Sequence, residues 1–281
     1  MTTTAARPRL LADYDVIELM DEGDEFVLYD AYSHERYCPC VLKTVRPDRL
    51  DDAEVVAALE LEARLLLSFT HPYWVRAYAL HHVPDTGAPV LVLEMLTGPD
   101  LEEILDERAR RLPAAELVNL GVQLCSAIGY LHDHGYLHLD VSPSNVIADP
   151  AGFARVLDLS LTRPIGATCP PGLGTPDYLS PEQARGDRVT EAADSWGIGL
   201  TLYEAATGHA PFDTPDAKKG ECPQLTRRAE PIRTLRPRLP GPLRELIDAC
   251  LSPDPADRPA IADMHATLRA LAADEPGNSR D

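Results

Sequence analysis

The sequence predicts an α+β protein in two parts: a smaller sheet-rich part with one helix, followed by a larger, mainly helical part. Residues 14–42 contain short alternating runs separated by polar turns, a pattern typical of strands. Beyond Gly98 and Pro99, apolar residues instead recur at three- and four-residue spacing, as in helices. We therefore expect one part over residues 10–96, a second over 97–272 and a frayed tail over 273–281.

Five strands and one helix are predicted in the first part, and five helices in the second. Residues 51–68 have helical periodicity, and Asp51 or Asp52 can cap the first turn of that helix. The strand-like runs are residues 16–17, 26–29, 40–42, 74–80 and 90–96. The helices of the second part are predicted over residues 101–112, 114–132, 194–208, 241–251 and 261–272.

Charge is the most unusual property of the composition. The chain has 281 residues and a net charge of −19, which disfavours nucleic acid as a partner because phosphate backbones attract basic surfaces. Residues 13–62 contain fifteen acidic and four basic side chains, whereas residues 218–238 contain seven basic and two acidic ones. These stretches are either ordinary solvated surface or docking surfaces for partners.

The sequence also indicates the compartment. No apolar run reaches the roughly 20 residues of a membrane span, and the N-terminus lacks the apolar core of a signal peptide. We expect no membrane segment and a cytoplasmic location. The six cysteines should then be reduced thiols, and Cys38 and Cys40 fit two strand residues better than a pair of metal ligands.

Residues 138–145 and 158–160 carry the strongest chemical signal. Asp140 is followed by Asn145, and Asp158 comes thirteen residues later. Phosphoryl transfer uses a carboxylate to orient the attacking hydroxyl, and a carboxamide and a second carboxylate to hold Mg²⁺ ions on a nucleotide triphosphate. The spacing therefore indicates Asp140 for the first role, with Asn145 and Asp158 as metal ligands.

These motifs resemble the catalytic loop and the metal-binding motif of protein kinases. The similarity is greatest to bacterial Ser/Thr protein kinases, because residues 71–72, 174–183 and 257–259 also match that branch, and all the motifs occur in the right order. The resemblance implies a two-lobed protein-kinase fold, with a small antiparallel sheet and one helix in the N-lobe and a larger helical C-lobe. It also implies ATP with Mg²⁺, or Mn²⁺, as cofactors.

The resemblance further assigns roles to individual residues. Lys43 would bind the α- and β-phosphates, and Glu62 would fix its ammonium group. Nucleotide contacts are implied for Gly23, Glu94 and Leu96. Structural roles in the C-lobe are implied for Thr175, which contacts the catalytic Asp, for Asp194, which ties down the catalytic-loop backbone, and for the buried pair of Glu182 and Arg258. His138 is expected to be a packing residue.

The family pattern is altered at four places. Leu139 replaces the arginine that binds a phosphorylated activation loop, so activation by loop phosphorylation is not expected. Ser142 replaces a lysine at the catalytic site, which should slow transfer without abolishing it. Ser160 replaces a glycine and should restrict switching of its motif. The phosphate-covering loop, residues 21–26, retains only Gly23 and carries four carboxylates.

Those carboxylates stand where a triphosphate would lie. Two like charges about 4 Å apart repel by about 1 kcal/mol in water and by more near protein. We expect weak nucleotide binding, or a loop held away from the phosphates. The sequence thus favours an atypical, slow Ser/Thr protein kinase acting on a protein substrate. The alternative is a pseudokinase that regulates a protein partner, and a small-molecule kinase is a distant third.

Overall fold

The structure, a computed structural model, describes residues 10–108, 111–212 and 222–274. The chain forms two compact units. The first consists of residues 1–70, 74–97 and 158–160, and the second of residues 71–73, 98–157 and 161–281. The short segment 158–160 thus belongs to the first unit, although both of its flanks belong to the second.

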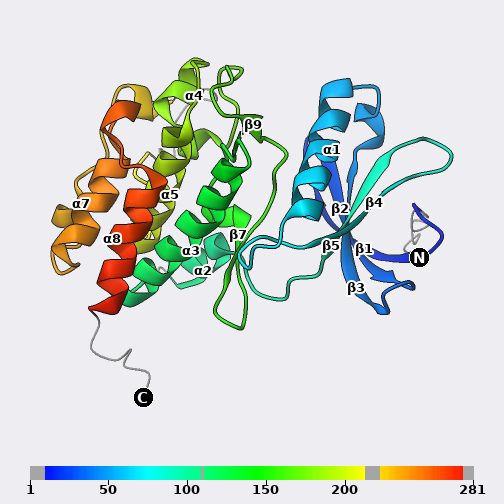
Figure 1. The fold of residues 1–281 in the computed structure, drawn as a ribbon, viewed down its shortest axis with the longest axis horizontal. Helices are drawn as coiled ribbons and strands as arrows, with labels where there is room; N and C mark the ends of the chain where they lie inside the picture. The colour runs from blue at the N-terminus through cyan, green and yellow to red at the C-terminus, as the bar shows by residue number, and fades with distance from the viewer. Residues whose placement is uncertain (1–9, 109–110, 213–221, 275–281) are drawn as a thin grey trace, which may run out of the picture. The chain divides into compact units, whose positions relative to one another are not determined.

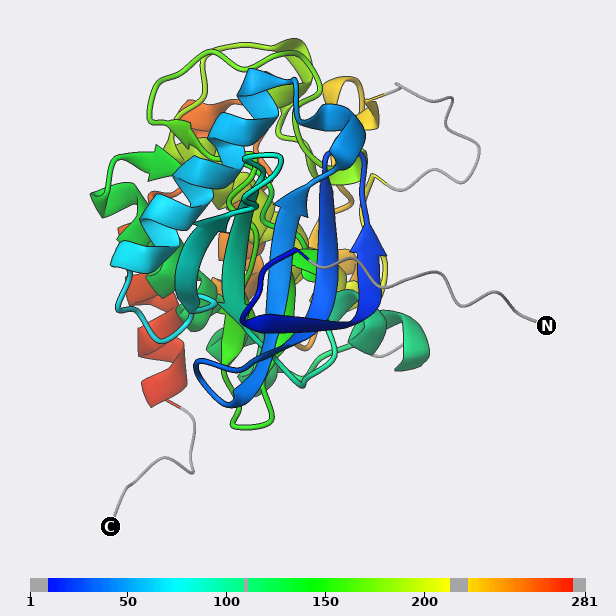
Figure 2. The same cartoon turned by 90° about the vertical axis from the view of Figure 1, so that its right-hand side faces the viewer.

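The first unit is an antiparallel sheet of five strands with one helix packed on it (Figures 1 and 2). The strand order is β1-β2-β3-β5-β4. Helix α1 is capped by Asp52, whose side chain accepts a hydrogen bond from the backbone of Glu54. The elements are β1 (Tyr14–Glu22), β2 (Phe26–Ser33), β3 (Cys38–Val45), α1 (Ala53–Ser68), β4 (Ala77–His82) and β5 (Pro89–Glu94).

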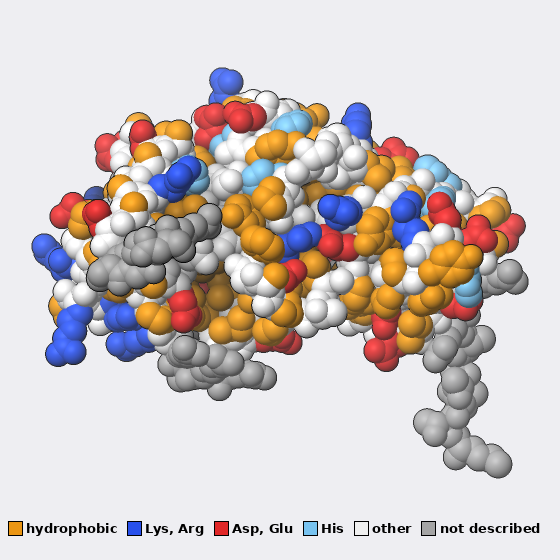
Figure 3. Space-filling view, turned by 60° about the horizontal axis from the view of Figure 1, so that its bottom comes forward, with side chains coloured by type: hydrophobic (Ala, Val, Ile, Leu, Met, Phe, Trp, Pro, Cys, Tyr) orange, Lys and Arg blue, Asp and Glu red, His pale blue; other side chains and the backbone are white. Residues whose placement is uncertain are grey.

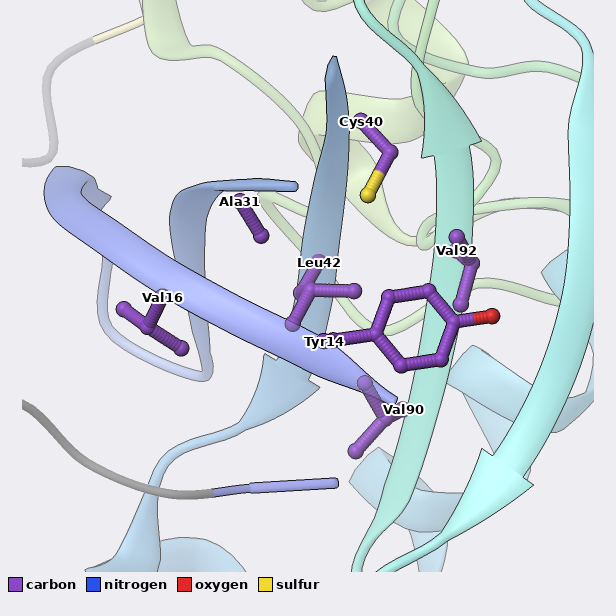
Figure 4. Close-up of a cluster of buried hydrophobic side chains, with 7 residues drawn as sticks. All are labelled: Tyr14, Val16, Ala31, Cys40, Leu42, Val90 and Val92. Atoms are coloured by element: carbon purple, nitrogen blue, oxygen red, sulfur yellow. The ribbon is translucent and has the colours of Figure 1, made fainter. Parts of the chain in front are cut away.

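One apolar cluster covers one face of this sheet. Figure 4 shows its side chains, which come from β1, β2, β3 and β5: Tyr14, Val16, Ala31, Cys40, Leu42, Val90 and Val92. Because side chains alternate along a strand, Lys43 points to the face opposite Leu42. That opposite face is the one covered by α1, and this alternation brings Lys43 to the helix.

The second unit is mainly helical, and α5 lies almost entirely buried at its centre. Helix α3 packs against α5 and α8, and α5 also contacts α7. Its helices are α2 (Leu101–Arg108), α3 (Ala114–Asp133), α4 (Pro181–Arg185), α5 (Glu191–Thr207), α6 (Ile232–Leu235), α7 (Gly241–Cys250) and α8 (Ile261–Ala273). Two short strand pairs complete it: β6 (Tyr136–Leu137) with β9 (Arg163–Pro164), and β7 (Val146–Ala148) with β8 (Ala154–Val156).

Helix α3 is long and apolar enough to cross a membrane by length and composition, and among the described helices it alone passes that test. Its 18-residue window is 56% buried inside the protein. Its apolar side chains face α5 and α8, which is how the core helix of a globular unit meets the same criterion.

Most element boundaries shift slightly from those predicted. The described part of helix α2 runs to Arg108, next to residues 109–110, which are not described. Leu112, the predicted last residue, is not helical and donates its backbone N–H to the carbonyl of Ala205. Helix α5 begins three residues earlier than predicted, at Glu191. Strand β4 begins at Ala77 rather than at residue 74. The short helices α4 and α6 were not predicted, since single turns carry little periodic signal.

Most charged side chains in the charged stretches of the sequence lie on the surface of their units, and the exceptions include the buried Lys43 and Glu62. Figure 3 shows acidic, basic and apolar side chains interspersed, with Lys and Arg side chains at the edge where Figure 1 shows α7. Arg227 donates to the carbonyl of Pro211, and Arg236 to those of Ala206 and Leu112. Lys218 and Lys219 lie outside the described residues. All six cysteines are free thiols.

Candidate active site

Lys43 is the centre of a buried ion-pair network in the first unit. Its Nζ lies 2.8 Å from Oε2 of Glu62 on α1 and 2.7 Å from Oδ1 of Asp158. The side chains of Lys43 and Glu62 are 4% and 1% exposed, so water screens this pair little. The structure thus brings together three of the residues that the sequence singled out.

Burial and charge oppose each other in this network. Burial alone would lower the pKa of Lys43, but the carboxylates of Asp158 and Glu62 outweigh it and raise that pKa above its usual value. For Asp158, burial acts to raise the pKa, yet the Lys43 ammonium brings it down to about 2. For Glu62, burial dominates and raises the pKa to about 7. Lys43 and Asp158 are therefore both charged at neutral pH.

Asp158 has an unusual backbone conformation, with φ of 58°, in the left-handed region that few non-glycine residues adopt. Its Oδ1 accepts the backbone N–H of Ser160 at 2.9 Å, which fixes the carboxylate. Leu159 is fully buried and fills an apolar position. Ser160 itself has an ordinary negative φ, so the conformation of this motif does not require glycine there.

The catalytic loop is held by Asp194, a buried residue of α5. Its two carboxylate oxygens accept the backbone N–H groups of His138 at 2.9 Å and of Leu139 at 2.8 Å. His132 also contacts Asp194 at 2.8 Å. Burial acts to raise the pKa of Asp194, but these bonds lower it below its usual value. The role expected for Asp194 matches this geometry.

Both ring nitrogens of His138 contact backbone atoms. Its ring is fully buried, with Nδ1 3.2 Å from the backbone nitrogen of Asp140 and Nε2 3.1 Å from the carbonyl oxygen of Leu157. Both nitrogens therefore have backbone partners, which leaves the imidazole no free position for proton transfer. The geometry agrees with a packing role.

Two side chains orient the carboxylate of Asp140. Asn145 donates from Nδ2 to Oδ2 and to the backbone carbonyl of Asp140, both at 2.9 Å. Thr175 donates to Oδ1 from its hydroxyl at 2.8 Å and from its backbone nitrogen at 3.0 Å. Asp140, Asn145 and Thr175 therefore form one hydrogen-bonded group in the second unit.

The two positions with altered catalytic-loop residues are both buried. Ser142 is inaccessible to solvent, and its hydroxyl lies 3.1 Å from that of Ser144. Leu139, with φ of 66°, belongs to an apolar cluster: Leu137, Leu139, Cys169, Val189 and Ala193, with Leu173 packed against it. At the position where the resemblance implies an arginine that binds a phosphate, this chain has apolar packing. That packing includes Cys169 and Leu173 of residues 158–182, which we call the activation segment.

Gln183 is a site residue that the sequence reasoning missed. Its Nε2 donates to the carbonyls of Leu139 at 2.8 Å and Leu173 at 3.0 Å, so it links the catalytic loop to the activation segment. Its Oε1 accepts from Ser180 in the capping box of α4. The pattern of Ser followed three residues later by Gln is a capping signal that could have found it.

Glu182 and Arg258 form the expected buried pair. Nη1 and Nη2 of Arg258 lie 2.6 and 2.9 Å from the two carboxylate oxygens of Glu182, a bidentate arrangement. Arg258 also donates to the carbonyls of Ser252 and Ala192, and its guanidinium lies 4.9 Å from the centre of the Trp196 ring. This pair joins α4 to the loop before α8.

The altered phosphate-covering loop is a tight turn between β1 and β2. The backbone N–H of Gly23 donates to the carbonyl of Phe26 at 3.0 Å. The ring of Phe26 lies 4.9 Å from Nζ of Lys43. Arg46, directly after β3, contacts the loop through both its backbone and its side chain. Sequence reasoning gave no role to Phe26 as an aromatic group or to Arg46.

Two residues expected to contact nucleotide lie near the end of the first unit's sheet. Glu94 is the last residue of β5, and its Oε1 accepts the backbone N–H of Arg76 at 2.7 Å. Leu96 follows the strand and is half-buried. Their contact with a nucleotide stays a prediction.

The donor atoms present suit Mg²⁺. This ion prefers oxygen ligands, one or two of them carboxylates, and takes substrate phosphates and water for the rest. Asp158 offers a charged carboxylate that is 36% exposed. Asn145 uses its nitrogen for Asp140, and its amide oxygen accepts no hydrogen bond from residues 10–108, 111–212 or 222–274. Each of these two side chains therefore offers an oxygen of the kind that Mg²⁺ prefers.

This fold and these motif geometries are those of a protein kinase. The sequence model of the protein kinase domain matches residues 14–268, and the chain belongs to this family. It is 32% identical over 273 residues to the serine/threonine-protein kinase pkn3 of Myxococcus xanthus, an alignment that covers 92% of this chain and 50% of that protein.

Two further bacterial relatives carry similar descriptions. The chain is 33% identical over 241 residues to the serine/threonine-protein kinase PkaA of Streptomyces coelicolor, covering 82% of this chain and 42% of that protein. It is 28% identical over 278 residues to the serine/threonine-protein kinase PrkC of Bacillus subtilis, an alignment that covers 97% of this chain and 42% of that protein. The resemblance to bacterial Ser/Thr kinases is confirmed. The chain spans half or less of the length of these relatives.

Proposed function

We propose that this domain is an atypical, slow Ser/Thr protein kinase that transfers the γ-phosphoryl group of ATP to a hydroxyl of a protein substrate. The observation that carries the proposal is the orientation of Asp140, whose carboxylate is held by Thr175 and Asn145 and whose loop is fixed by Asp194. A carboxylate held in this way can orient a substrate hydroxyl and accept its proton.

The other residues have supporting roles in this proposal. Lys43, positioned by Glu62, binds the α- and β-phosphates, while Gly23, Glu94 and Leu96 contact the nucleotide. Asn145 and Asp158 hold Mg²⁺, or Mn²⁺, which when bound neutralises phosphate charge. The catalytic site has Ser142 where the family has lysine, so one source of positive charge for the transferring group is missing and the reaction is slow.

The proposal also concerns the partner molecule of this domain and its compartment in the cell. The partner is a protein, and the domain works in the cytoplasm, a compartment in which its free cysteines stay reduced. Nucleic acid is an unfavourable partner because the net charge is −19.

A pseudokinase is the second candidate. Two observations favour it: the ring of Phe26 lies over the Lys43 ammonium, and Leu139 has become part of an apolar cluster. A protein of that kind would use the two units to bind and regulate a protein partner, with or without nucleotide.

A paired measurement separates the two functions. ATP binding is titrated with Mg²⁺, with Mn²⁺ and with a chelator, and transfer of labelled phosphate to the protein itself or to a generic protein substrate is followed in parallel. Asp140→Asn should keep stability and nucleotide affinity and lose transfer, while Ser142→Lys should raise the rate about tenfold or more. If neither the wild type nor Ser142→Lys transfers phosphate with either metal, the kinase assignment is rejected.

A further inference from the structure

Arg46 makes two hydrogen bonds to the phosphate-covering loop. The backbone N–H of Arg46 donates to the carbonyl of Glu25 at 2.9 Å, and Nη1 donates to the carbonyl of Gly23 at 3.1 Å. These two carbonyls lie on either side of Asp24. One residue therefore holds both arms of the turn.

The guanidinium that makes this contact is itself oriented. Its Nε and Nη2 donate to the two carboxylate oxygens of Asp48 at 2.9 and 3.1 Å. This bidentate pair leaves Nη1 for Gly23 and for the Glu22 carboxylate, which lies 3.9 Å away. Arg49 lies near the loop as well, with Nη2 3.9 Å from Oε1 of Glu25, although its closer partner is Oδ2 of Asp52 at 2.8 Å.

The direction of the carbonyls determines the direction of the amides. In a planar trans peptide, the N–H points opposite to the C=O of the preceding residue. Because the carbonyl of Gly23 points to Nη1 of Arg46, the N–H of Asp24 points away from that side chain. The N–H of Phe26 faces β1, because the carbonyl of Glu25 points to Arg46 on the β3 side of the hairpin. Within the described residues, the N–H of Asp24 makes no backbone hydrogen bond. Outward-pointing amides of a turn are a common anion-binding arrangement.

We propose that Arg46 is a positioning residue for nucleotide phosphates: it partly neutralises the acidic loop and turns the backbone amide of Asp24 toward the phosphate group. This inference rests on the proposed function, because it concerns the same nucleotide. It explains how a loop with Asp21, Glu22, Asp24 and Glu25 can accept a triphosphate. In place of the missing glycines, the loop has a backbone whose direction Arg46 fixes, and the guanidinium of Arg46 partly compensates its negative charge.

The test compares ligands with and without phosphates. In Arg46→Gln, the affinity for MgATP should fall about three- to tenfold, the range expected for a charge-assisted hydrogen bond, while the affinity for adenosine stays unchanged. Arg46→Lys should recover part of the lost affinity for MgATP, because lysine restores the positive charge but not the planar set of N–H donors. Asp48→Asn should weaken MgATP binding less than Arg46→Gln, since it loosens the guanidinium and leaves its charge in place.

Arg64→Gln is the matched control, because Arg64 is exposed on α1 in the same unit and its loss changes the net charge equally. It should leave both affinities unchanged. The proposal is overturned if Arg46→Gln binds MgATP as tightly as Arg64→Gln does, or if adenosine binding weakens as much as MgATP binding. A wild type that binds adenosine and not MgATP overturns it as well. Normal MgATP binding by the wild type without phosphoryl transfer counts against the kinase assignment alone, and the Arg46 comparison then still decides the proposal.

Discussion

Thr175 donates two hydrogen bonds to a single carboxylate oxygen of Asp140, one from its backbone nitrogen at 3.0 Å and one from its hydroxyl at 2.8 Å. Asn145 supplies the other oxygen with a partner at 2.9 Å. The carboxylate is thus held from two different segments of the chain, the catalytic loop and the activation segment. A substrate hydroxyl that binds Asp140 would therefore approach a carboxylate oxygen that already accepts a hydrogen bond from Thr175 or Asn145.

Thr175→Val removes the hydroxyl and keeps both the shape of the side chain and the backbone donor. We expect the transfer rate at saturating MgATP to fall about tenfold, because the Asp140 carboxylate loses one charge-assisted hydrogen bond. The affinity for MgATP should not change. Thr267→Val is the control, since its hydroxyl donates only within α8, to Asp263. Equal rates for the two variants would show that the Thr175 hydroxyl does not orient Asp140.

Arg258→Ala should destabilise the second unit strongly. Removing one partner of a buried ion pair typically costs about 3–5 kcal/mol, because the other charge stays buried without compensation. Arg258 additionally donates to three backbone carbonyls, those of Ser252, Ala192 and Pro253, which would lose this donor. Replacing both members by apolar residues, Glu182→Leu with Arg258→Met, should cost less than Arg258→Ala. The measurement is the free energy of unfolding in urea, and a loss of a few tenths of a kcal/mol would contradict the assignment.

The sequence predicted the two-part fold because its signals are local and strongly periodic. Helix α1 and its Asp52 cap are an example, since apolar spacing and a capping carboxylate are both visible in one short stretch. Motif order likewise allowed Lys43, Glu62 and Asp158 to be named before their contact was known. The side-chain alternation that turns Lys43 toward α1 could be read from the strand, although its contact with Asp158 could not.

The remaining site residues depend on tertiary contacts that no local pattern encodes. Gln183 reaches Leu139 across 44 positions in the sequence, and Arg46 reaches Gly23 across 23. The acidic loop was expected to repel nucleotide because only its own residues were considered. Its countercharge lies after β3, and the antiparallel pairing of β2 with β3 brings the two together. Sequence reasoning therefore identified the carboxylates of the loop and missed the arginine, Arg46, that lies beside them.

Gly174→Ala should uncouple Thr175 from Asp140. Gly174 has φ of 127°, and a Cβ there would lie 3.1 Å from the carbonyl oxygen of Leu139 and 2.8 Å from a methyl group of Leu179. We expect slower transfer and a loss of stability of about 1–3 kcal/mol, from backbone strain and collision together. Gly172→Ala is the matched control, with φ of 79° and open space around its Cβ. Similar effects of both changes would mean that strain, rather than close packing beside Leu139, sets the cost.

Asp158 should make stability depend on pH in the acid range. Its pKa is about 2 in the folded protein against an ordinary value of 3.8, because the Lys43 ammonium outweighs burial. A lowered carboxyl pKa contributes stability that is full above the ordinary value and is lost as the pH falls toward the folded value. Asp158→Asn should therefore be less stable than the wild type at pH 6, by about 1 kcal/mol once solvent screening of this partly exposed group is included.

That difference should shrink between about pH 4 and pH 2, measured by urea unfolding of both proteins at each pH. The buried Glu62, which shares the Lys43 ammonium with Asp158, changes stability at higher pH and with the opposite sign. Its raised pKa, about 7 against 4.5, makes the folded protein bind the extra proton, so stability falls as the pH rises through that range. The two pH ranges do not overlap. A constant gap between wild type and Asp158→Asn from pH 6 to pH 2.5 would show that the charge of Asp158 does not stabilise the folded protein through Lys43.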